Sequence, residues 1–243
     1  MARSFSIVLA VVATIMAAVA KTEVTNLRSQ VVAPNIPLGE CAEFAVMAGT
    51  AVTFNGGLTT VYTGDVGVSP GTSVTGNYQL NDGSVEITST KSNQCASDRT
   101  TAYNAAAAAV CPPSNILNEL SGRTLFPGVY CAPTSPMTFS AGTVTLDARG
   151  DITATWIFQA SSSFVSAPYT SFILENGAQA TNIFFQVGTS ATLGYSSSFV
   201  GTIIADASVS LQTDTVLTGR ALAGAGASFA GADSVTLPAL ITY

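Results

Sequence analysis

The chain has 243 residues, of which only 9% are charged; it contains no histidine, and its formal net charge is −6 at pH 7. Globular domains ordinarily carry about 25% charged residues, so Ser, Thr, Gly and Ala must build most of this surface. The acidic balance argues against nucleic acid and anionic membranes as partners, because both attract basic surfaces. Without histidine a Ser-His-Asp triad is excluded, and without a Cys-x-x-Cys pair a zinc site is not expected. We expect no cofactor and no metal.

The first twenty residues have the pattern of a secretory signal peptide. Arg3 provides a basic start, residues 7–18 form an apolar run, and Ala18-Val19-Ala20 is a small-x-small cleavage site. The run has twelve residues, whereas a membrane-spanning helix needs roughly 20. We therefore expect residues 1–20 to be removed. Residues 21–243 should then be secreted as a single domain, free of the membrane, with a net charge of −7 (the eight basic residues less Arg3, against fourteen acidic).

Residues 44–68 alternate apolar and turn-forming residues, as short strands do. After them, one helix is predicted at about residues 97–111. Ser97 or Asp98 can cap its start, the alanines of residues 105–109 favour it, and Pro112 and Pro113 end it. Its apolar stripe would contain Tyr103, Ala106, Ala107 and Val110. A helix of about 14 residues is roughly 21 Å long, so it would cover about four or five strands spaced about 4.8 Å apart.

The second half of the chain repeats itself with an offset of 27 residues. Residues 143–150 align with residues 170–177, and residues 129–131 align with 156–158 and then with 183–185. The same offset carries Gln159 onto Gln186. A fixed offset of this size is typical of repeat architectures.

Further along the chain the offset shortens to 18 residues. The matching columns are Leu193, Leu211 and Phe229; Ala191, Val209 and Ala227; Phe199, Leu217 and Val235; Ile204, Leu222 and Leu240; and Gly201 with Gly219. Each repeat contains three short segments of alternating apolar and polar residues, such as 203–206, 208–211 and 215–218. Three strands per repeat predict a β-solenoid of triangular section. The alternative is a β-sandwich in which this spacing is coincidental.

Several motifs give the chain a specific resemblance. They are FAVMAG at 44–49, TGDVGVSPG at 63–71, PGVYC at 127–131, WIFQ at 156–159 and NIFFQVG at 182–188, and the series runs from about Leu38 to Pro238. In these motifs and their order the chain resembles the microbial ice-binding (antifreeze) proteins with a discontinuous β-solenoid fold. The resemblance implies a mainly β fold: an irregular, discontinuous, right-handed β-solenoid of triangular section, with one long α-helix packed along its axis. It also implies that the first turn of the solenoid docks beside the carboxy-terminal turns, and that the ligand is the ice crystal surface.

Ice recognition requires a flat, rigid and uncharged face whose methyl and hydroxyl groups order water. Of the three faces of the predicted solenoid, the first is mixed, with Phe184, Gln186 and Asp206 outward, and is expected beneath the helix. The second has Phe139, Phe164, Leu193, Leu211 and Phe229 inward. Its outward residues are Thr138, Ser161, Ser163, Ser190, Thr192, Ser208, Ser210, Gly226 and Ser228. The third shows Thr143, Thr145, Ser198, Val200, Val216, Thr218, Ser234 and Thr236.

We predict that the second face binds ice, with Thr63 as an addition from the amino-terminal part. The alternative is that these hydroxyl side chains only keep the strands soluble and suit their β propensity. The whole chain is expected to act as a monomer.

The four cysteines, Cys41, Cys95, Cys111 and Cys131, allow three disulfide connectivities in a secreted protein. We favour Cys41–Cys95 and Cys111–Cys131, because the predicted helix lies between Cys95 and Cys111 and one bridge at each end would attach it to the solenoid.

No catalytic function is expected. The carboxylates Asp147, Asp151, Glu175, Asp206, Asp214 and Asp233 fall mainly near turns, where they suit turn formation. Only Asp147 and Glu175 are expected to approach one another. The alternative function is a secreted, non-enzymatic adhesin or matrix protein that binds polysaccharide through the same face.

Overall fold

The computed structural model describes residues 35–239. The predicted signal peptide (residues 1–20) and Leu240 lie outside the described residues. Within residues 35–239 no helix is long and apolar enough to cross a membrane.

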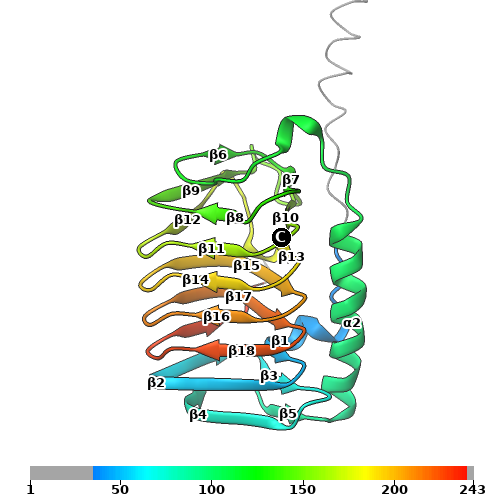
Figure 1. The fold of residues 1–243 in the computed structure, drawn as a ribbon, viewed down its shortest axis with the longest axis vertical. Helices are drawn as coiled ribbons and strands as arrows, with labels where there is room; N and C mark the ends of the chain where they lie inside the picture. Colours follow the sequence, from blue (N-terminus) through cyan, green and yellow to red (C-terminus); the bar gives the residue numbers. More distant parts are fainter. Residues whose placement is uncertain (1–34, 240–243) are drawn as a thin grey trace, which may run out of the picture. The chain divides into compact units, whose positions relative to one another are not determined.

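The strands stack into three faces around one core, and every pairing between them is parallel (Figure 1). The first face contains β7 (Gly128–Ala132), β10 (Trp156–Ala160), β13 (Ile183–Val187), the second parts of β15 (Ser198–Ala205) and β17 (Val216–Ala223), β1 (Phe44–Ala48), β3 (Asp65–Val68) and β5 (Val85–Ile87). The second face contains β8 (Met137–Phe139), β11 (Phe164–Ser166), β14 (Ala191–Leu193), β16 (Val209–Leu211), β18 (Gly226–Phe229) and the first parts of β2 (Ala51–Thr63) and β4 (Ser73–Leu80).

The third face contains β6 (Thr124–Leu125), β9 (Thr143–Asp147), β12 (Ser171–Glu175), the first parts of β15 and β17, β19 (Ser234–Thr236) and the second parts of β2 and β4. Three short 3₁₀ segments, η1 (Gly39–Glu43), η2 (Pro113–Asn115) and η3 (Ala180–Asn182), complete the connections. The mainly β, three-faced solenoid is therefore confirmed, and the β-sandwich alternative is wrong.

The stack is discontinuous in sequence, as the resemblance implied. Val46 of β1 pairs with Ala221 of β17, and Phe54 of β2 pairs with Phe229 of β18. The amino-terminal strands therefore follow the last carboxy-terminal turn, and Figure 1 shows blue β2 directly beside red β18. Buried Arg220 holds this joint, because its Nε and Nη2 donate to the carbonyl oxygen of Ala42 at 3.1 and 2.7 Å.

The observed register confirms the 18-residue repeat and corrects part of the 27-residue repeat. Leu193, Leu211 and Phe229 are register partners, as predicted. Between β7 and β10, however, the offset is 28: Val129 pairs with Ile157, not with Trp156. The offset between β9 and β12 is also 28, because Thr143 pairs with Ser171. The physical reason is turn length, since the turn at 133–136 is one residue longer than the turn at 161–163, and the turn at 167–170 is one residue longer than the turn at 140–142. A shift of one residue exchanges inward and outward side chains.

The core is filled by like residues stacked from turn to turn. Tyr130, Phe158 and Phe185 form a stacked column with ring centroids 5.6 and 4.7 Å apart. Phe172 and Phe199 meet Phe185 from the third face at 5.7 and 4.9 Å. Interlocked aromatic rings give a rigid core, on which the outer faces are supported.

The helix, α2 (Thr90–Ala107), begins and ends earlier than predicted. Its N-cap is Ser89, whose Oγ accepts from the amide of Ser92 at 3.1 Å. Asp98, one of the predicted caps, instead accepts from the Glu40 amide at 2.8 Å. The buried stripe contains Ser92, Cys95, Ala102 and Ala106, so Ala106 alone of the predicted stripe is buried, and Val110 lies beyond the helix with 70% of its surface exposed. The sequence analysis missed the first residues of α2 because the residues buried there, Ser92 and Cys95, are small or polar.

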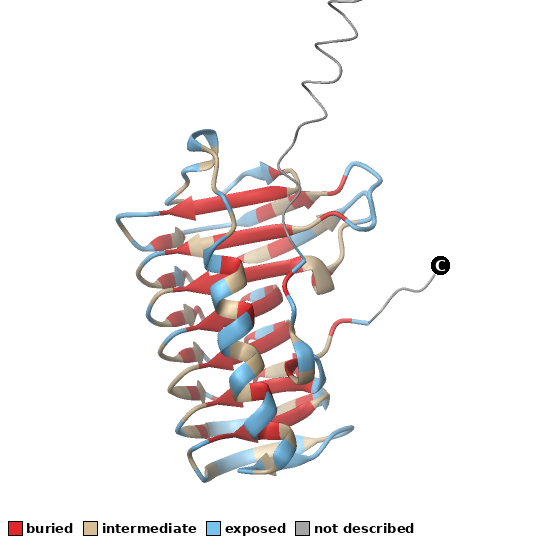
Figure 2. Ribbon diagram, turned by 90° about the vertical axis from the view of Figure 1, so that its right-hand side faces the viewer, coloured by how far each residue is buried: buried red, intermediate tan, exposed pale blue. Residues whose placement is uncertain are grey.

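Helix α2 lies along the first face, as predicted, and spans several of its strands (Figure 2). Its buried residues pack with Val129, Ile157, Phe184, Ile204 and Leu222, one from each successive strand of that face. Both predicted disulfides, Cys41–Cys95 and Cys111–Cys131, are confirmed. They fasten the helix in its second turn, at Cys95, and just beyond its carboxyl end, and the second and third faces remain uncovered by it.

Candidate functional site

The second face carries one continuous column of outward side chains, here called the central column. Register pairs place Thr138, Val165, Thr192, Ser210, Ser228, Thr53 and Thr75 next to one another on seven successive strands. Neighbouring strands are about 4.8 Å apart, so the column presents a regular series of small side chains. Four of the predicted residues, Thr138, Thr192, Ser210 and Ser228, lie in it.

A second column, here called the leading column, lies just before the first inward residue of each strand. Ser163, Ser190, Ser208 and Gly226 occupy it, as predicted. Their stacking is shown by three backbone bonds, in which Met137, Phe164 and Ala191 donate to the carbonyl oxygens of Ser163, Ser190 and Ser208. Gly226 pairs with Ala51, and Ala51 with Ser73, so the column continues onto the amino-terminal strands.

Two predicted residues lie elsewhere. Ser161 is in the turn before β11, where its Oγ donates to the Ala132 carbonyl at 2.9 Å, beside α2. Thr63 is at the end of β2 on the third face, where it pairs with Thr236 and its Oγ1 accepts from the Leu237 amide at 2.9 Å. The structure therefore does not bring Ser161 and Thr63 together with the two columns.

The prediction missed five members of this face: Val165, Thr53, Thr75, Ala51 and Ser73. The 27-residue offset could have found Val165, which lies between Thr138 and Thr192 in sequence as well as in space. Residues 51–54 (AVTF) also resemble 226–229 (GASF), and this likeness could have indicated Thr53 once the docking of the first turn was considered.

Glu119 ends the central column, because it forms a β-bridge with Thr138. Its carboxylate accepts hydrogen bonds from the Thr138 hydroxyl at 2.8 Å, the Ser121 amide at 2.8 Å and the Ser140 amide at 3.1 Å. Burial raises the pKa of Glu119, but hydrogen bonds from Ser121 and Ser140 outweigh it and lower the pKa to about 2. Glu119 is therefore negatively charged at neutral pH and lies at one edge of the face.

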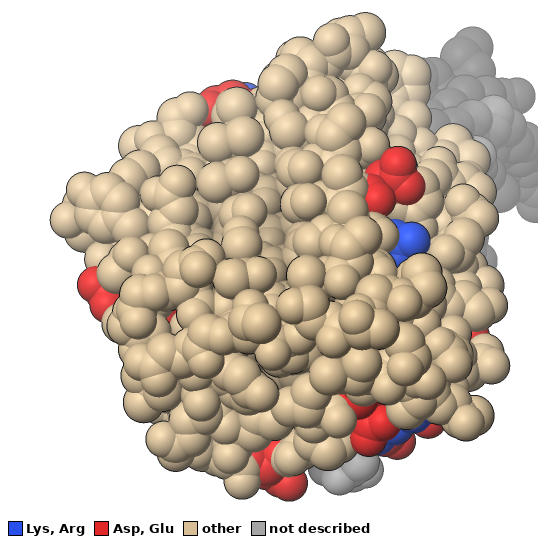
Figure 3. Space-filling view, turned by 60° about the horizontal axis from the view of Figure 1, so that its bottom comes forward, with Lys and Arg blue, Asp and Glu red and all other residues tan. Residues whose placement is uncertain are grey.

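Away from Glu119 the hydroxyls of the central column remain largely available to water. Ser228 donates to Ser210 at 2.9 Å. Within residues 35–239, the side chains of Thr192, Thr53 and Thr75 make no hydrogen bond to protein. Each of these threonines presents a methyl group and an unused hydroxyl. In Figure 3 the centre of the visible surface carries no charged side chain; charged groups lie toward its edges and to the right of its centre.

The third face is less uniform. Its corresponding outward column contains Thr145, Ile173, Val200, Thr218 and Thr236. Ile173 and Val216 expose 41% and 43% of their surfaces, and Tyr62 exposes 48%. At one end Asp147 pairs with Glu175, as predicted, which adds acidic charge. Side chains of unequal size make this face rougher than the second.

Three of the predicted turn carboxylates, Asp147, Asp151 and Asp233, accept hydrogen bonds from backbone amides. Asp147 and Asp151 accept from amides two residues ahead, at Arg149 and Thr153. Buried Asp233 accepts from the Thr215 and Gly231 amides at 2.9 and 3.1 Å. In the part of the chain that the structure describes, no group of three or more His, Cys, Asp or Glu side chains is placed to hold a metal ion.

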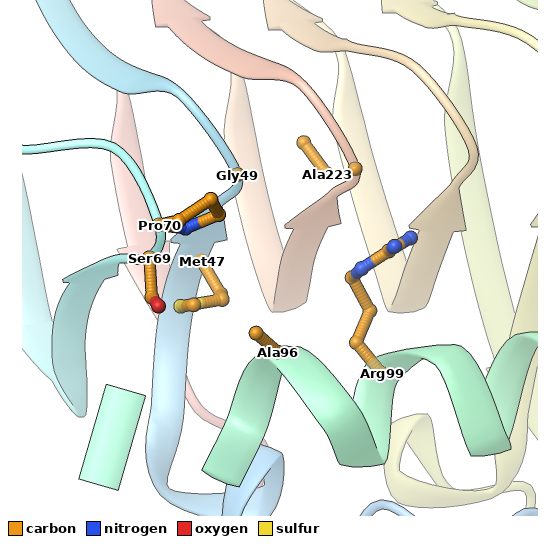
Figure 4. A pocket seen from close by; sticks show the side chains of 8 residues that line it. Met47, Gly49, Ser69, Pro70, Ala96, Arg99 and Ala223 are labelled. Atoms are coloured by element: carbon orange, nitrogen blue, oxygen red, sulfur yellow. The ribbon is translucent and has the colours of Figure 1, made fainter. Parts of the chain in front are cut away.

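A small cavity of about 190 Å³ lies between α2 and the first face. Figure 4 shows Arg99 reaching from α2 toward the strands, with Met47, Ser69 and Pro70 opposite. Nη1 of Arg99 donates to the Ala205 carbonyl at 3.1 Å. Burial lowers the pKa of Arg99, and its hydrogen bond to the strand carbonyl fits a role in holding the helix to the sheet.

These features define a rigid β-solenoid with one uncovered, regular face of small hydroxyl and methyl side chains. The chain belongs to the Ice-binding-like family, whose sequence model matches residues 46–236. It is 36% identical over 229 residues to an ice-binding protein of Nostoc sp. (strain HG1), which covers 93% of this chain and 79% of that protein.

Solved structures of ice-binding proteins share the fold. One, from an Antarctic biological consortium, has a TM-score of 0.79 and 42% identity, covering 86% of this chain and 93% of that one. Another, from the Antarctic ascomycete Antarctomyces psychrotrophicus, has a TM-score of 0.79 and 33% identity, covering 85% of this chain and 100% of that one.

Proposed function

We propose that this protein binds ice and inhibits ice growth and recrystallisation through the second face. The observation that carries the proposal is the unbroken central column, from Thr138 to Thr75, whose side chains are small and uncharged on seven successive strands. Fixed strands hold these groups at a repeat of about 4.8 Å, close to an oxygen spacing in ice. Since the core beneath is rigid, little ordering entropy opposes binding.

The contact residues that we propose are the members of the two columns: Thr138, Val165, Thr192, Ser210, Ser228, Thr53, Thr75, Ser163, Ser190, Ser208, Gly226, Ala51 and Ser73. Ser161 and Thr63 are left out because both hydroxyl groups lie away from the columns. Polysaccharide adhesion through the same face is less well supported, since neither column contains an aromatic side chain on which a sugar ring would stack. The protein acts without catalysis, as a secreted monomer whose signal peptide ends at Ala20.

The test compares two matched threonines. Thr192 and Thr218 are both half-buried outward residues in central strands, on the second and third faces respectively. Thr192→Tyr should abolish most of the gap between melting and freezing temperatures in a nanolitre osmometer, because a large ring prevents a flat contact. Thr218→Tyr should leave the gap unchanged. The opposite result would assign ice binding to the third face.

A further inference from the structure

The joint between the amino-terminal and carboxy-terminal parts of the solenoid has a short ladder on the first face. Between β1 and β17 the register pairs are Val46 with Ala221 and Met47 with Leu222, whereas β15 and β17 are paired along eight residues. A short ladder contains few backbone hydrogen bonds, so it opens at a lower cost in free energy than the longer ladders beside it. Contacts outside the ladder therefore contribute more to fixing β1 in its place.

Arg220 of β17 makes such a contact. Its Nε and Nη2 both donate to the carbonyl oxygen of Ala42, at 3.1 and 2.7 Å, and its Nη1 donates to the Thr202 hydroxyl at 3.4 Å. Ala42 lies in η1, two residues before β1 begins. Because the guanidinium group is planar and rigid, two of its donors on one oxygen fix the direction of the contact as well as its length. Arg220 therefore sets where β1 starts along the face.

Arg220 is a buried charge without a carboxylate partner in the described part of the chain. Only 7% of its surface is exposed, and the ion pairs within residues 35–239 are those of Lys91 with Glu43 and Asp65. Burial lowers the pKa of Arg220 to about 10, so the side chain is still charged at neutral pH. A buried charge is costly, and apolar residues of similar volume often stabilise a buried position as well or better. The geometry imposed on Ala42 is therefore what distinguishes Arg220 from an apolar residue.

The position of β1 is passed on to the second face through a tight turn. From β1 the chain runs through Gly49 and Thr50 into β2, and the Thr50 amide donates to the Ala225 carbonyl at 2.9 Å. A Cβ atom on Gly49 would overlap the carbonyl oxygen of Gly224, so this turn has no room to absorb a shift of β1. A shift of β1 would therefore also move Thr53, three residues beyond the turn.

We propose that Arg220 is a positioning residue for the ice-binding face. Through Ala42 it keeps Thr53 and Thr75 in line with the five members of the central column that come from the carboxy-terminal part. Thr53 pairs with Ser228 of that part and Thr75 pairs with Thr53, so both depend on the same joint. The proposal rests on the proposed function of the second face.

The first measurement is amide hydrogen exchange, followed by NMR in the chain from Lys21. The Thr50 amide reports on the joint, and the Ala225 amide is its matched control, because it makes the equivalent bond one turn earlier, to the Ala207 carbonyl at 2.7 Å. Arg220→Leu should speed exchange at Thr50 by about tenfold or more, the effect of losing a hydrogen bond to a charged group. Exchange at Ala225 should not change. Equal acceleration at both amides, or none at Thr50, would overturn the proposal.

The second measurement is a double-mutant comparison of the gap between melting and freezing temperatures in a nanolitre osmometer. With Arg220 present, Thr53→Tyr and Thr192→Tyr should both narrow the gap. In the Arg220→Leu protein the gap should already be narrower, and Thr53→Tyr should have no further effect because Thr53 is already out of line. Thr192→Tyr, far from the joint, should still narrow it. An equal effect of Thr53→Tyr in both backgrounds would overturn the proposal.

If Arg220→Leu does not fold, Arg220→Lys replaces it in both measurements. Lysine keeps the charge but not the planar pair of donors, so the same changes are expected with smaller size. Hydrogen exchange is measured without ice. A wild-type protein that shows no gap would therefore contradict the proposed function, whereas unchanged exchange at Thr50 in the variant would contradict the role of Arg220.

Discussion

The two disulfides should stabilise the fold by different amounts. In the chain-entropy description a bridge restricts the unfolded chain, and the restriction grows with the length of the closed loop. Cys41–Cys95 spans 54 residues and Cys111–Cys131 spans 20. With these loop lengths, removing the first bridge should lower the free energy of unfolding by about 4 kcal/mol, and removing the second by about 3 kcal/mol. The first also ties η1, which leads into the docked strand β1, to α2.

Guanidinium unfolding of the Cys41→Ala/Cys95→Ala and Cys111→Ala/Cys131→Ala proteins measures both values, provided that the denaturant slope stays constant. Both variants should still shape ice where they are folded, since the bridges lie along α2 and away from the second face. The reasoning is refuted if the 20-residue loop contributes more than the 54-residue loop, or if either bridge contributes less than about 1 kcal/mol.

Three further predictions concern single side chains. Val165→Thr adds a hydroxyl to the central column and should widen the gap between melting and freezing temperatures. Val216 on the third face is the matched control, because 43% of its surface is exposed against 41% for Val165, and Val216→Thr should not change the gap. Equal effects of the two substitutions would contradict the assignment of ice binding to the second face. Because the pKa of Glu119 is lowered from 4.5 to about 2, its contribution to stability is present above pH 4.5 and is lost as the pH falls toward 2. Denaturation curves of Glu119→Gln should therefore show a smaller decrease in the free energy of unfolding between pH 4.5 and 2. Burial raises the pKa of Asp233 from 3.8 to about 6, so its contribution to stability is present below pH 3.8 and is lost as the pH rises through 6. If Asp233→Asn leaves the dependence of the free energy of unfolding on pH unchanged, this prediction is contradicted.

The repetitive part of the solenoid could be predicted because parallel stacking leaves a direct trace in sequence. Leu193, Leu211 and Phe229 recur at a fixed offset since each fills the same place in successive turns. Where a turn gains one residue, as at 133–136, the offset changes to 28 and the alignment of Val129 with Trp156 fails. Repeat offsets therefore indicate the fold more reliably than they indicate single register pairs.

The docking of the amino-terminal strands could not be derived from periodicity, because it joins Val46 to Ala221 across most of the chain. Only the family resemblance implied it, and for that reason Thr53 and Thr75 were missed. The start of α2 was missed for another reason. Ser92 and Cys95 are buried without forming an apolar stripe, since the helix rests on the sheet through small side chains and a disulfide.

The most direct test of ice binding is the growth of a single ice crystal in the purified chain from Lys21, observed in a nanolitre osmometer beside an equal mass of albumin. Faceted crystals that stop growing across a measurable gap between melting and freezing temperatures are the predicted result. Round, freely growing crystals at high concentration of a protein shown to be folded would contradict the account.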